Sequence, residues 1–421
     1  MSTQSDARWR VLAPFEYREF RLLIAAMSIS LFAEGMWTVV MALQVIALAD
    51  DPAALSLVAA CLATGMLAFI LVGGIVADRA PQRVIIIAVE IANVAATGAV
   101  AILGMLGDLQ LWHMAVAAAV LGIGAAFFFP AYSAYLPRIL PAEMLLAANG
   151  VEGAIRPTLQ QAIGPAAAGV LIGLTFPALG SVTVTVAFAV ALILLVAMRT
   201  GDGSHIVMAV EREKSHALTD LRDGLRFVLH TRWLRWTLLF ACTWVFLAMG
   251  PIEVLLPFIA HQRFANGDQV YGIMLAAFGI GSALGALAVS SRPLPRRYLT
   301  VMMLMWGAGS LPFVIVGSTS SLTVMVIALF VIGLTDGAGM VIWGTLLQRR
   351  VPPEMLGRVS SLDFFVSLAF MPVSMAVAGP LSKVVPVELI FAVTGIAPVL
   401  LAVIALVSAR MPHDEIAHPL R

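Results

Sequence analysis

The chain has 421 residues, of which 61% are hydrophobic and only 12% are charged, and its formal net charge is +1. A soluble domain carries about 25% charged residues, so a chain with half that share cannot cover a water-facing surface of this size. The composition excludes a soluble enzyme, a nucleic-acid-binding protein and a disordered scaffold, and it predicts an all-α polytopic membrane protein. Cys61 and Cys242 both lie in apolar stretches, which excludes a disulfide framework and a cysteine metal site.

Apolar stretches long enough to cross a bilayer recur along the whole chain. About 20 apolar residues form one membrane-spanning helix, and this length predicts twelve transmembrane helices. They cover residues 21–48, 54–77, 84–106, 113–135, 150–174, 178–198, 234–260, 270–291, 298–317, 322–346, 360–384 and 386–409. No small-residue cleavage pattern follows the first stretch, so we expect it to be a retained span rather than a signal peptide.

Basic residues are concentrated in alternate loops. With an even number of spans, 22 of the 25 Lys and Arg residues fall on the side of the two termini, and only Arg263 and Lys383 fall on the other. Arg156 lies within a span. Because basic loops remain in the cytoplasm, we expect both termini there. The use of 23 arginines against two lysines favours a GC-rich bacterium, so the expected location is the bacterial cytoplasmic membrane.

An internal repeat relates the two ends of the chain. Pro-Ala-Glu-Met-Leu at 141–145 recurs 211 residues later as Pro-Pro-Glu-Met-Leu at 352–356. Further pairs at this offset are Gly74 with Gly285, Gly122 with Gly333, and Glu152 with Asp363. Several matches at one offset indicate duplicated halves.

The repeat predicts three parts. Residues 1–198 and 234–421 are two six-helix halves that run in parallel, because six is an even number of spans. Residues 199–233 form a cytoplasmic linker, in which alternating apolar and charged residues predict an amphipathic helix on the membrane surface.

Motifs of enzymes and of ATP-driven pumps are missing from the sequence. It contains no G-x-x-x-x-G-K-[ST] loop and no G-x-S-x-G turn. The histidines fall in loops or at span edges, where they cannot form an intramembrane metal site. We therefore expect no enzymatic activity, no metal and no cofactor.

The connection between the second and third spans, on the cytoplasmic side, contains Gly74, Asp78, Arg79 and Arg83. The glycine permits close helix approach, and Asp78 can lie against the positive end of a neighbouring helix. Arg79 and Arg83 are placed to pair with acids on adjacent loops. The alternative is a basic loop with no further role, and we interpret the motif as a structural gate.

This G-x-x-A-D-R-x-x-x-R motif resembles the signature loop of the major facilitator superfamily, and twelve spans with a half-chain repeat fit that superfamily over the whole length. Residues 129–150 and 348–359 resemble its proton-driven exporters, among them the enterobactin exporter and the Tap-type and macrolide efflux pumps. The resemblance implies a central cavity between spans one, four, seven and ten. We also assign Arg358, Glu152 and Asp363 to a cytoplasmic gate, with the two acids facing Arg79, Arg83 or Arg296. Because acids in a first helical turn also stabilise the helix dipole, that structural role of Glu152 and Asp363 is the alternative, and the two do not exclude each other.

The sequence departs from the family pattern at several positions. An antiporter-like motif in the fifth span retains Gly164, Pro165 and Gly169, but Gln160 occupies an expected glycine. Ala118 stands where some drug antiporters have an arginine, so a coupling scheme built on that arginine does not apply here.

Four acidic residues lie well inside predicted spans, away from the first turn of each span. An ionisable group at bilayer depth costs about 2.5–3.5 kcal/mol and therefore indicates a function. Glu34, Glu253 and Asp336 fall on spans one, seven and ten, and we take them as candidates for proton coupling. For each of them, a structural hydrogen-bonded carboxyl is the alternative. Glu253 follows an expected helix break at Gly250-Pro251, so it is also a candidate gate residue. Glu90, on span three, is expected to form a structural ion pair.

An adaptable apolar cavity is expected from methionines and aromatic residues, which repack around varied ligands. The candidates for substrate contact are Met36, Trp37, Phe127, Phe128 and Met249. For any one of them, a core or lipid-facing position is the alternative. Because the cavity helices carry acids and no base, cationic or neutral amphiphiles are favoured over anions.

These features predict a monomeric exporter that exchanges protons for drug-like small molecules within the lipid bilayer. One alternative is a siderophore or lysolipid exporter of the same fold, in which Arg156 would reach the cavity. A second alternative is a membrane receptor or assembly factor that transports nothing.

Overall fold

The computed structural model describes residues 13–141, 144, 148, 151–153, 155–198, 217–290, 292, 294–352, 355, 359, 362–363, 365–366 and 368–420. The side chains of residues 71, 78, 79, 217–221, 223 and 348 lie outside this description. Contacts divide the chain into two units. Unit 1 is Met1–Glu211 with Asn266–Gly272, and unit 2 is Arg212–Ala265 with Ile273–Arg421.

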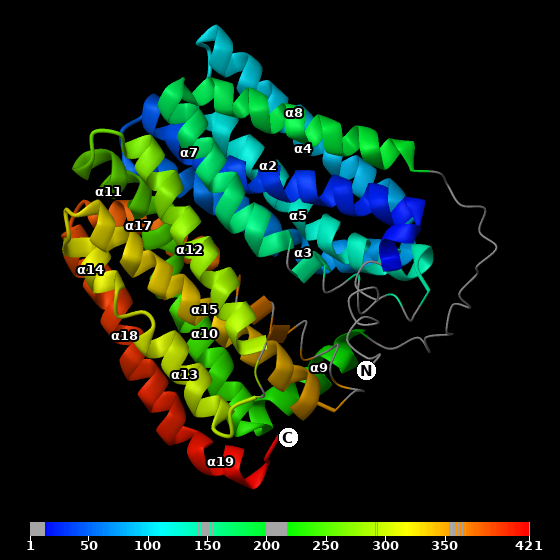
Figure 1. The fold of residues 1–421 in the computed structure, drawn as a ribbon, viewed down its shortest axis with the longest axis vertical. Coiled ribbons are helices and arrows are strands. Elements are labelled where there is room, and N and C mark those ends of the chain that lie inside the picture. Colours follow the sequence, from blue (N-terminus) through cyan, green and yellow to red (C-terminus); the bar gives the residue numbers. More distant parts are fainter. Residues whose placement is uncertain are drawn as a thin grey trace, which may run out of the picture. The chain divides into compact units, whose positions relative to one another are not determined.

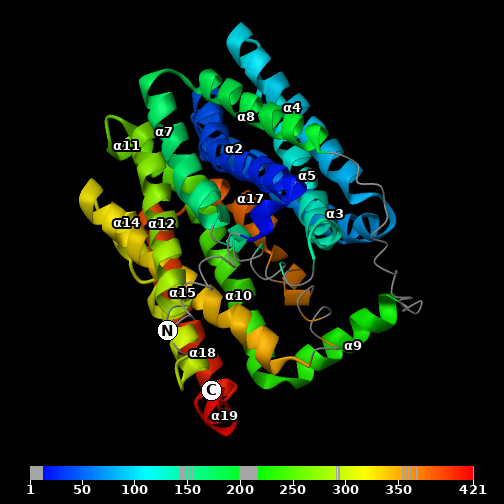
Figure 2. The ribbon, with the colours of Figure 1, turned by 45° about the vertical axis from the view of Figure 1, so that its right-hand side comes forward.

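Unit 1 is built on a long, buried first helix. Its elements are η1 (Ala13–Glu16), α2 (Arg18–Leu48), α3 (Pro52–Arg79), α4 (Gln82–Leu106), α5 (Leu111–Ile139), η2 (Pro157–Ile163), α7 (Gly164–Leu174) and α8 (Pro177–Ala197). Helix α2 packs along α8 and against α7 and η2, whereas α5 packs along α3 and α4 (Figures 1 and 2). Side chains from both groups of helices form one apolar core around Phe20 and Phe128.

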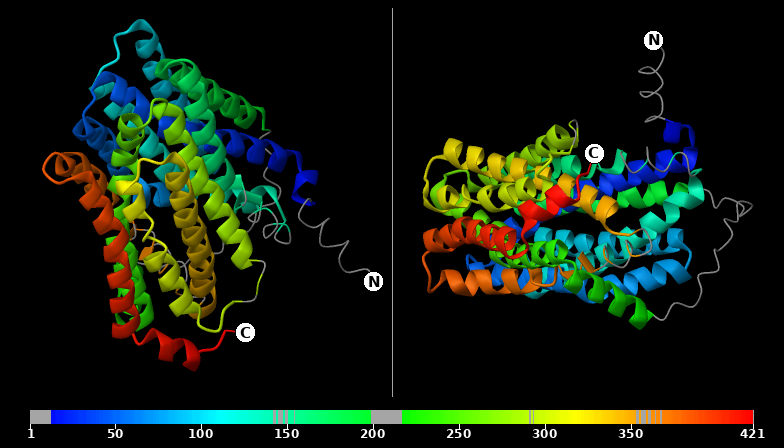
Figure 3. Two further views of the ribbon diagram at one scale, coloured as in Figure 1. Left: turned by 60° about the vertical axis from the view of Figure 1, so that its left-hand side comes forward. Right: turned by 90° about the horizontal axis from the view of Figure 1, so that it is seen from below.

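Unit 2 is built around α10, α13 and α18. Its elements are α9 (Ala217–His230), α10 (Arg232–Gly250), η3 (Pro251–Leu255), α11 (Leu256–Arg263), α12 (Gly267–Ser290), α13 (Tyr298–Ala308), α14 (Phe313–Ser318), α15 (Leu322–Arg350), α17 (Met371–Ser382), α18 (Val387–Ser408) and α19 (Met411–Ala417). The first turns of α12 belong to unit 1. Helix α18 contacts α10, α13 and α14, and the chain then turns into the short helix α19, red in Figure 3.

Local sequence determines several helix ends. The Asp51 side chain accepts a hydrogen bond from the backbone N–H of Ala53 at 2.9 Å, and Pro52 is the first residue of α3. Helix α4 ends at Gly107, whose φ of 82° lies in the left-handed region that glycine adopts without strain. These signals explain the short connections at this end of unit 1.

Ten helices in the described part of the chain are long and apolar enough to cross a membrane, and they coincide with ten of the twelve predicted spans. The predicted spans 150–174 and 360–384 include residues outside the description. Within them the structure shows η2 with α7 and the shorter apolar helix Met371–Ser382. The protein is therefore a multi-pass membrane protein, while the count of twelve and the orientation of the termini stay predictions.

The helix break expected at Gly250-Pro251 is wrong. The chain continues from α10 through the π-helical segment η3 into α11, as one apolar helical stretch, Arg232–Arg263. Proline removes one backbone donor, and a π turn respaces the remaining hydrogen bonds without ending the helix. The linker helix predicted within 199–233 is present as α9.

Glycines bring α5 against α3 and α15 against α12. A Cβ on Gly122 would clash with the Leu62 carbonyl, and one on Gly333 would clash with the Phe278 carbonyl. The two glycines are 211 residues apart, as the repeat predicts, but Leu62 and Phe278 are 216 apart.

The predicted pairing of Gly74 with Gly285 is therefore wrong. Open space surrounds the Cβ position of Gly74, whereas a Cβ on Gly285 would clash with the Leu334 carbonyl of α15. Gly65 is the counterpart of Gly281. Gly65 lies against the Ala119 carbonyl of α5, and Gly281 lies against the Phe330 carbonyl of α15, 211 residues later. The offset between equivalent residues is 211 for α5 and α15 but 216 for α3 and α12. The sequence of α12 is therefore shifted by five residues relative to the repeat, and only the contacts between helices reveal this shift.

Helix α19 closes one end of unit 2. Glu415 is fully buried and accepts hydrogen bonds from the backbone N–H groups of Leu299 and Thr300, at 2.9 and 3.1 Å. It also accepts one from the Thr300 hydroxyl at 2.7 Å. The carboxylate thus caps the first turn of α13, where unpaired N–H groups and the helix dipole favour a negative charge. The neighbouring Asp414 pairs with Arg350 of α15.

We expect Glu415→Ala to destabilise the protein by about 1–3 kcal/mol, because it leaves buried backbone donors without a partner. The measurement is the thermal unfolding midpoint of the purified protein in lipid nanodiscs. Ile416→Ala is the matched control, since this neighbouring side chain is 64% exposed. Equal midpoints for Glu415→Ala and the control would contradict the capping role.

Candidate transport site

Glu34 lies in the middle of α2 and bonds to a neutral side chain. Its Oε2 accepts a hydrogen bond from the Nε2 of Gln160 at 2.7 Å, and the residue as a whole is partly exposed. Two glycines make this possible. A Cβ on Gly35 would clash with the Gln160 carbonyl, and one on Gly164 would lie 2.7 Å from the Phe32 carbonyl. The backbones of α2 and η2 are therefore close enough for the two side chains to meet.

Gln160 accounts for one departure from the family motif. It occupies a position where the resemblance leads us to expect glycine, and it lies in the π-helical segment η2. Such segments often occur at functional sites. Here the larger side chain supplies the hydrogen-bond donor for Glu34, so the departure from the motif has a structural role.

Arg156 lies one turn before Gln160, and its charge is already paired. Its guanidinium donates to the Glu152 carboxylate at 2.6 Å and lies 4.3 Å from the centre of the Phe129 ring. Arg156 also interacts electrostatically with Glu34. Among the described contacts Glu152 pairs with Arg156, four residues further along the chain, as i and i+4 side chains do when they share one face. Its gate contacts with Arg79, Arg83 or Arg296 stay a prediction.

Glu90 of α4 is the second carboxyl of this region. It is only 1% exposed, its Oε1 accepts a hydrogen bond from the Ser30 hydroxyl of α2, and the Asn93 amide lies nearby on α4. The structural ion pair expected for Glu90 is wrong, since the partners that the structure describes are a hydroxyl, an amide and the nearby Glu34. Its Oε2 is buried without a hydrogen-bond partner among the described residues.

Arg83 pairs with backbone rather than with an acid. Its guanidinium donates to the carbonyls of Val196 and Met198 at 3.1 and 2.9 Å, at the end of α8. The last carbonyls of a helix have no partner within it and attract cations. The prediction that Arg83 pairs with acids on adjacent loops is therefore wrong among the described contacts.

The other predicted gate residues are only partly described. The side chains of Asp78 and Arg79 lie outside the described part of the chain, and so does all of Arg358. Asp363 accepts a hydrogen bond from the indole N–H of Trp343 at 3.0 Å. The gate stays a prediction.

The antiporter-like motif forms close backbone contacts within unit 1. A Cβ on Gly169 would lie 2.8 Å from the Cα of Gly272, and one on Gly272 would lie 2.8 Å from the Pro165 carbonyl. Gly164, as described above, faces α2. Each glycine of the motif is therefore required by a neighbouring backbone.

The predicted cavity residues occupy different environments. Met36, Trp37 and Phe128 are buried in unit 1, with exposed fractions of 1, 2 and 5%. Phe127 is partly exposed and lies against Phe69, with ring centres 6.3 Å apart. Met249 of unit 2 is also partly exposed. A role in substrate contact stays a prediction for all five.

Unit 2 carries the two remaining acids. Glu253 lies in η3 and Asp336 lies in α15, and both are partly exposed. Neither carboxyl has a hydrogen-bond or ion-pair partner among the residues that the structure describes. Next to Asp336, Gly337 packs against Ser282 of α12 so closely that a Cβ would clash with its carbonyl. Whether these acids take part in proton coupling stays a prediction.

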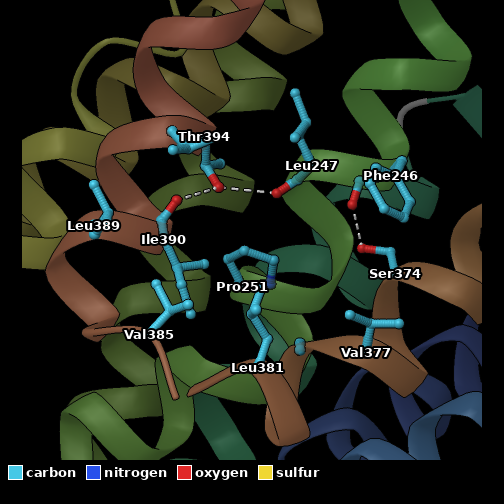
Figure 4. Close-up of a pocket in the computed structure, with 12 residues that line it drawn as sticks. Phe246, Leu247, Pro251, Ser374, Val377, Leu381, Val385, Leu389, Ile390 and Thr394 are labelled. Carbon is cyan, nitrogen blue, oxygen red and sulfur yellow. Dashed lines mark hydrogen bonds between the residues drawn. The ribbon is translucent and has the colours of Figure 1, made fainter. Parts of the chain in front are cut away.

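A crevice of about 200 Å³ lies in unit 2 between α10, η3, α17 and α18 (Figure 4). Its two hydroxyls are used by the backbone. The Thr394 hydroxyl lies 2.9 Å from the Leu247 carbonyl oxygen, and the Ser374 hydroxyl donates to the Phe246 carbonyl at 2.6 Å. The crevice therefore presents hydrocarbon, and no charged residue lines it.

Sequence reasoning gave no role to Ser30 and did not identify Gln160 as a site residue. Two signals were available. Ser30 precedes Glu34 by four residues and so lies on the same face of one helix. Gln160 replaces an expected glycine. Neither signal names the partner, which depends on how the helices pack.

Comparisons with known proteins agree with this architecture. The chain is 24% identical to macrolide efflux protein A of Streptococcus pyogenes over 347 residues, covering 79% of this chain and 81% of the relative. It is 26% identical to the multidrug efflux pump Tap of Mycolicibacterium fortuitum, covering 82% of this chain and 85% of the relative. Among solved structures, the nucleoside transporter NupG superposes with a TM-score of 0.72 at 15% identity, over 93% of this chain and 98% of NupG, which shows the shared fold.

The family model for transmembrane secretion effectors matches residues 10–419, nearly the whole chain. This match confirms the resemblance drawn from the signature loop. A multi-pass helical architecture, efflux pumps among the relatives and an almost complete family match lead to one conclusion: the chain belongs to the transmembrane secretion effector family of the major facilitator superfamily.

Proposed function

We propose that this transporter exports amphipathic, cationic or neutral small molecules in exchange for protons, by alternating access of its two halves. The observation that supports proton coupling is the environment of Glu34. It is an acid within a membrane-spanning helix, partly exposed, and bonded to an amide rather than to a cation. A carboxyl held in this way binds and releases a proton at low cost, because a tight ion pair would hold it permanently in the charged form.

The substrate class rests on charge. Arg156 is the only base of a predicted span that does not lie within two residues of a span end, and its guanidinium already contacts the Glu152 carboxylate and the Phe129 ring. An anionic siderophore or lysolipid would therefore have to displace an existing ion pair. The names of the macrolide and multidrug efflux relatives support export of uncharged or cationic drugs.

The energy of the proton gradient is sufficient for such export. A membrane potential near 150 mV supplies about 3.5 kcal/mol for each charge that crosses, which corresponds to a concentration gradient of roughly 300-fold. One proton per molecule of a neutral substrate is therefore enough to sustain efflux, whereas a monovalent cation exchanged for one proton moves no net charge and depends on the pH gradient.

We expect Glu34→Gln to abolish substrate-driven proton movement while substrate still exchanges across the membrane without a gradient. Glutamine fills the same volume and keeps a hydrogen-bonding group for Gln160, but it cannot bind or release a proton. The measurement is the internal pH of inverted vesicles after addition of lipophilic cationic dyes and of macrolides.

Glu388→Gln is the matched control for Glu34→Gln, because this acid is 59% exposed at the start of α18. Asp336→Asn and Glu253→Gln, measured alongside, show whether the acids of unit 2 share the role. Equal alkalinisation in wild type and Glu34→Gln would remove Glu34 from proton coupling.

Competition separates the substrate classes. We expect a permanently cationic dye and a neutral macrolide to compete for efflux, and a multiply anionic siderophore not to compete. The physical reason is that the described acids outnumber unpaired bases within the spans. Strong competition by the siderophore, lost in Arg156→Gln, would favour the alternative exporter function.

A further inference from the structure

Glu90 has no role in the mechanism described so far. A carboxyl that is 1% exposed within a membrane protein is costly unless it is paired or protonated. Its Oε1 is bound by Ser30, but its Oε2 is buried without a hydrogen-bond partner among the described residues. A charged carboxylate would leave that oxygen uncompensated, whereas a protonated carboxyl needs far less compensation.

No cation is found among the described groups that interact with Glu90. The helices packed against α4 are mainly α5 and α8. Helix α8 contains no charged residue, and His113 and Arg138, the charged residues of α5, lie at its two ends. The charged group that faces Glu90 is therefore a second acid, Glu34, with which it interacts electrostatically.

Helix α2 places both partners of Glu90 on one face. Ser30 and Glu34 are one turn apart, and the first donates a hydrogen bond to Glu90 while the second lies close enough to repel it. The two residues differ in exposure, because Glu34 as a whole is partly exposed and Glu90 is 1% exposed. Glu34 also interacts electrostatically with Arg156, whereas the only described charged group that interacts with Glu90 is Glu34. Two like charges that interact in a medium of low dielectric constant cannot both be present at low cost.

We propose that Glu34 and Glu90 form a carboxyl pair that shares one proton, with Glu90 as the buried proton-binding site and Glu34 as the accessible one. This inference rests on the proposed proton coupling and adds a second residue to it. When the proton leaves an oxygen of Glu34 and binds an oxygen of Glu90, the pair carries one negative charge before and after the transfer. The carboxylate of Glu34 is then free to meet a cationic substrate.

The first experiment measures the pair without any substrate. Infrared difference spectra of the purified protein, recorded against pH, follow the C=O band of protonated carboxyls. We expect Glu90→Gln to remove a band present in the wild type. We expect Glu34→Gln to move the titration midpoint of the remaining Glu90 band by about one pH unit or more, because coupled groups titrate together.

Ser30→Ala is the matched control for these spectra. It removes the hydrogen bond to Glu90 but leaves both carboxyls, so we expect a displaced band that is still sensitive to Glu34→Gln in the double variant. A Glu90 band that titrates identically with and without Glu34, or no protonated band from Glu90 between pH 5 and pH 9, would overturn the pair.

The second experiment measures transport. In inverted vesicles we expect Glu90→Gln to lose substrate-driven proton movement, as Glu34→Gln does, while gradient-independent substrate exchange remains. We expect Ser30→Ala to retain proton movement, because this variant keeps the Glu90 carboxyl. If Glu90 had a purely structural role, loss of its hydrogen bond in Ser30→Ala would be as harmful as loss of its carboxyl in Glu90→Gln. Wild-type coupling in Glu90→Gln, with coupling lost in Glu34→Gln, would overturn the pair and leave the proposed function intact. No proton movement in the wild type with any compound would overturn the proposed function itself.

Discussion

The close approach of two backbones in unit 1 determines where the polar groups of this transporter meet. Gly35 of α2 faces the carbonyl of Gln160, and Gly164 faces the carbonyl of Phe32. Any larger residue at either position would separate the helices and with them the carboxyl of Glu34 and the amide of Gln160. Helices in a membrane associate largely through such close packing, since the lipid supplies no hydrophobic force between them.

A second constraint acts on every polar group inside the bilayer, because no water is present to replace a missing hydrogen bond. The described groups meet it in different ways. Arg156 pairs with Glu152, and Arg83 binds the carbonyls at the end of α8. Glu34 and Glu90 instead bond to an amide and a hydroxyl, which are neutral. Neutral partners leave both carboxyls able to exchange a proton, and this separates them from the groups with a structural role.

The two halves show how a duplicated fold can diverge without losing its contacts. Gly122 and Gly333 keep the same role at an offset of 211 residues, while the helices that they contact have moved to an offset of 216. The glycines on α3 and α12 follow the new register, as Gly65 and Gly281 show. Both halves therefore keep the close crossing of two helices, α3 with α5 and α12 with α15, although the sequence offset between equivalent glycines has changed.

Sequence alone determined the membrane class, the location of ten spans, the presence of acids within them and the family, which the match over residues 10–419 confirms. Hydropathy, length and short motifs are local properties, so they can be read along the chain. Tertiary structure decided which side chains form hydrogen bonds with each other. Gln160 meets Glu34 across 126 residues, and Ser30 meets Glu90 across 60. Such contacts depend on the rotation and depth of each helix relative to its neighbours, and packing between helices sets both.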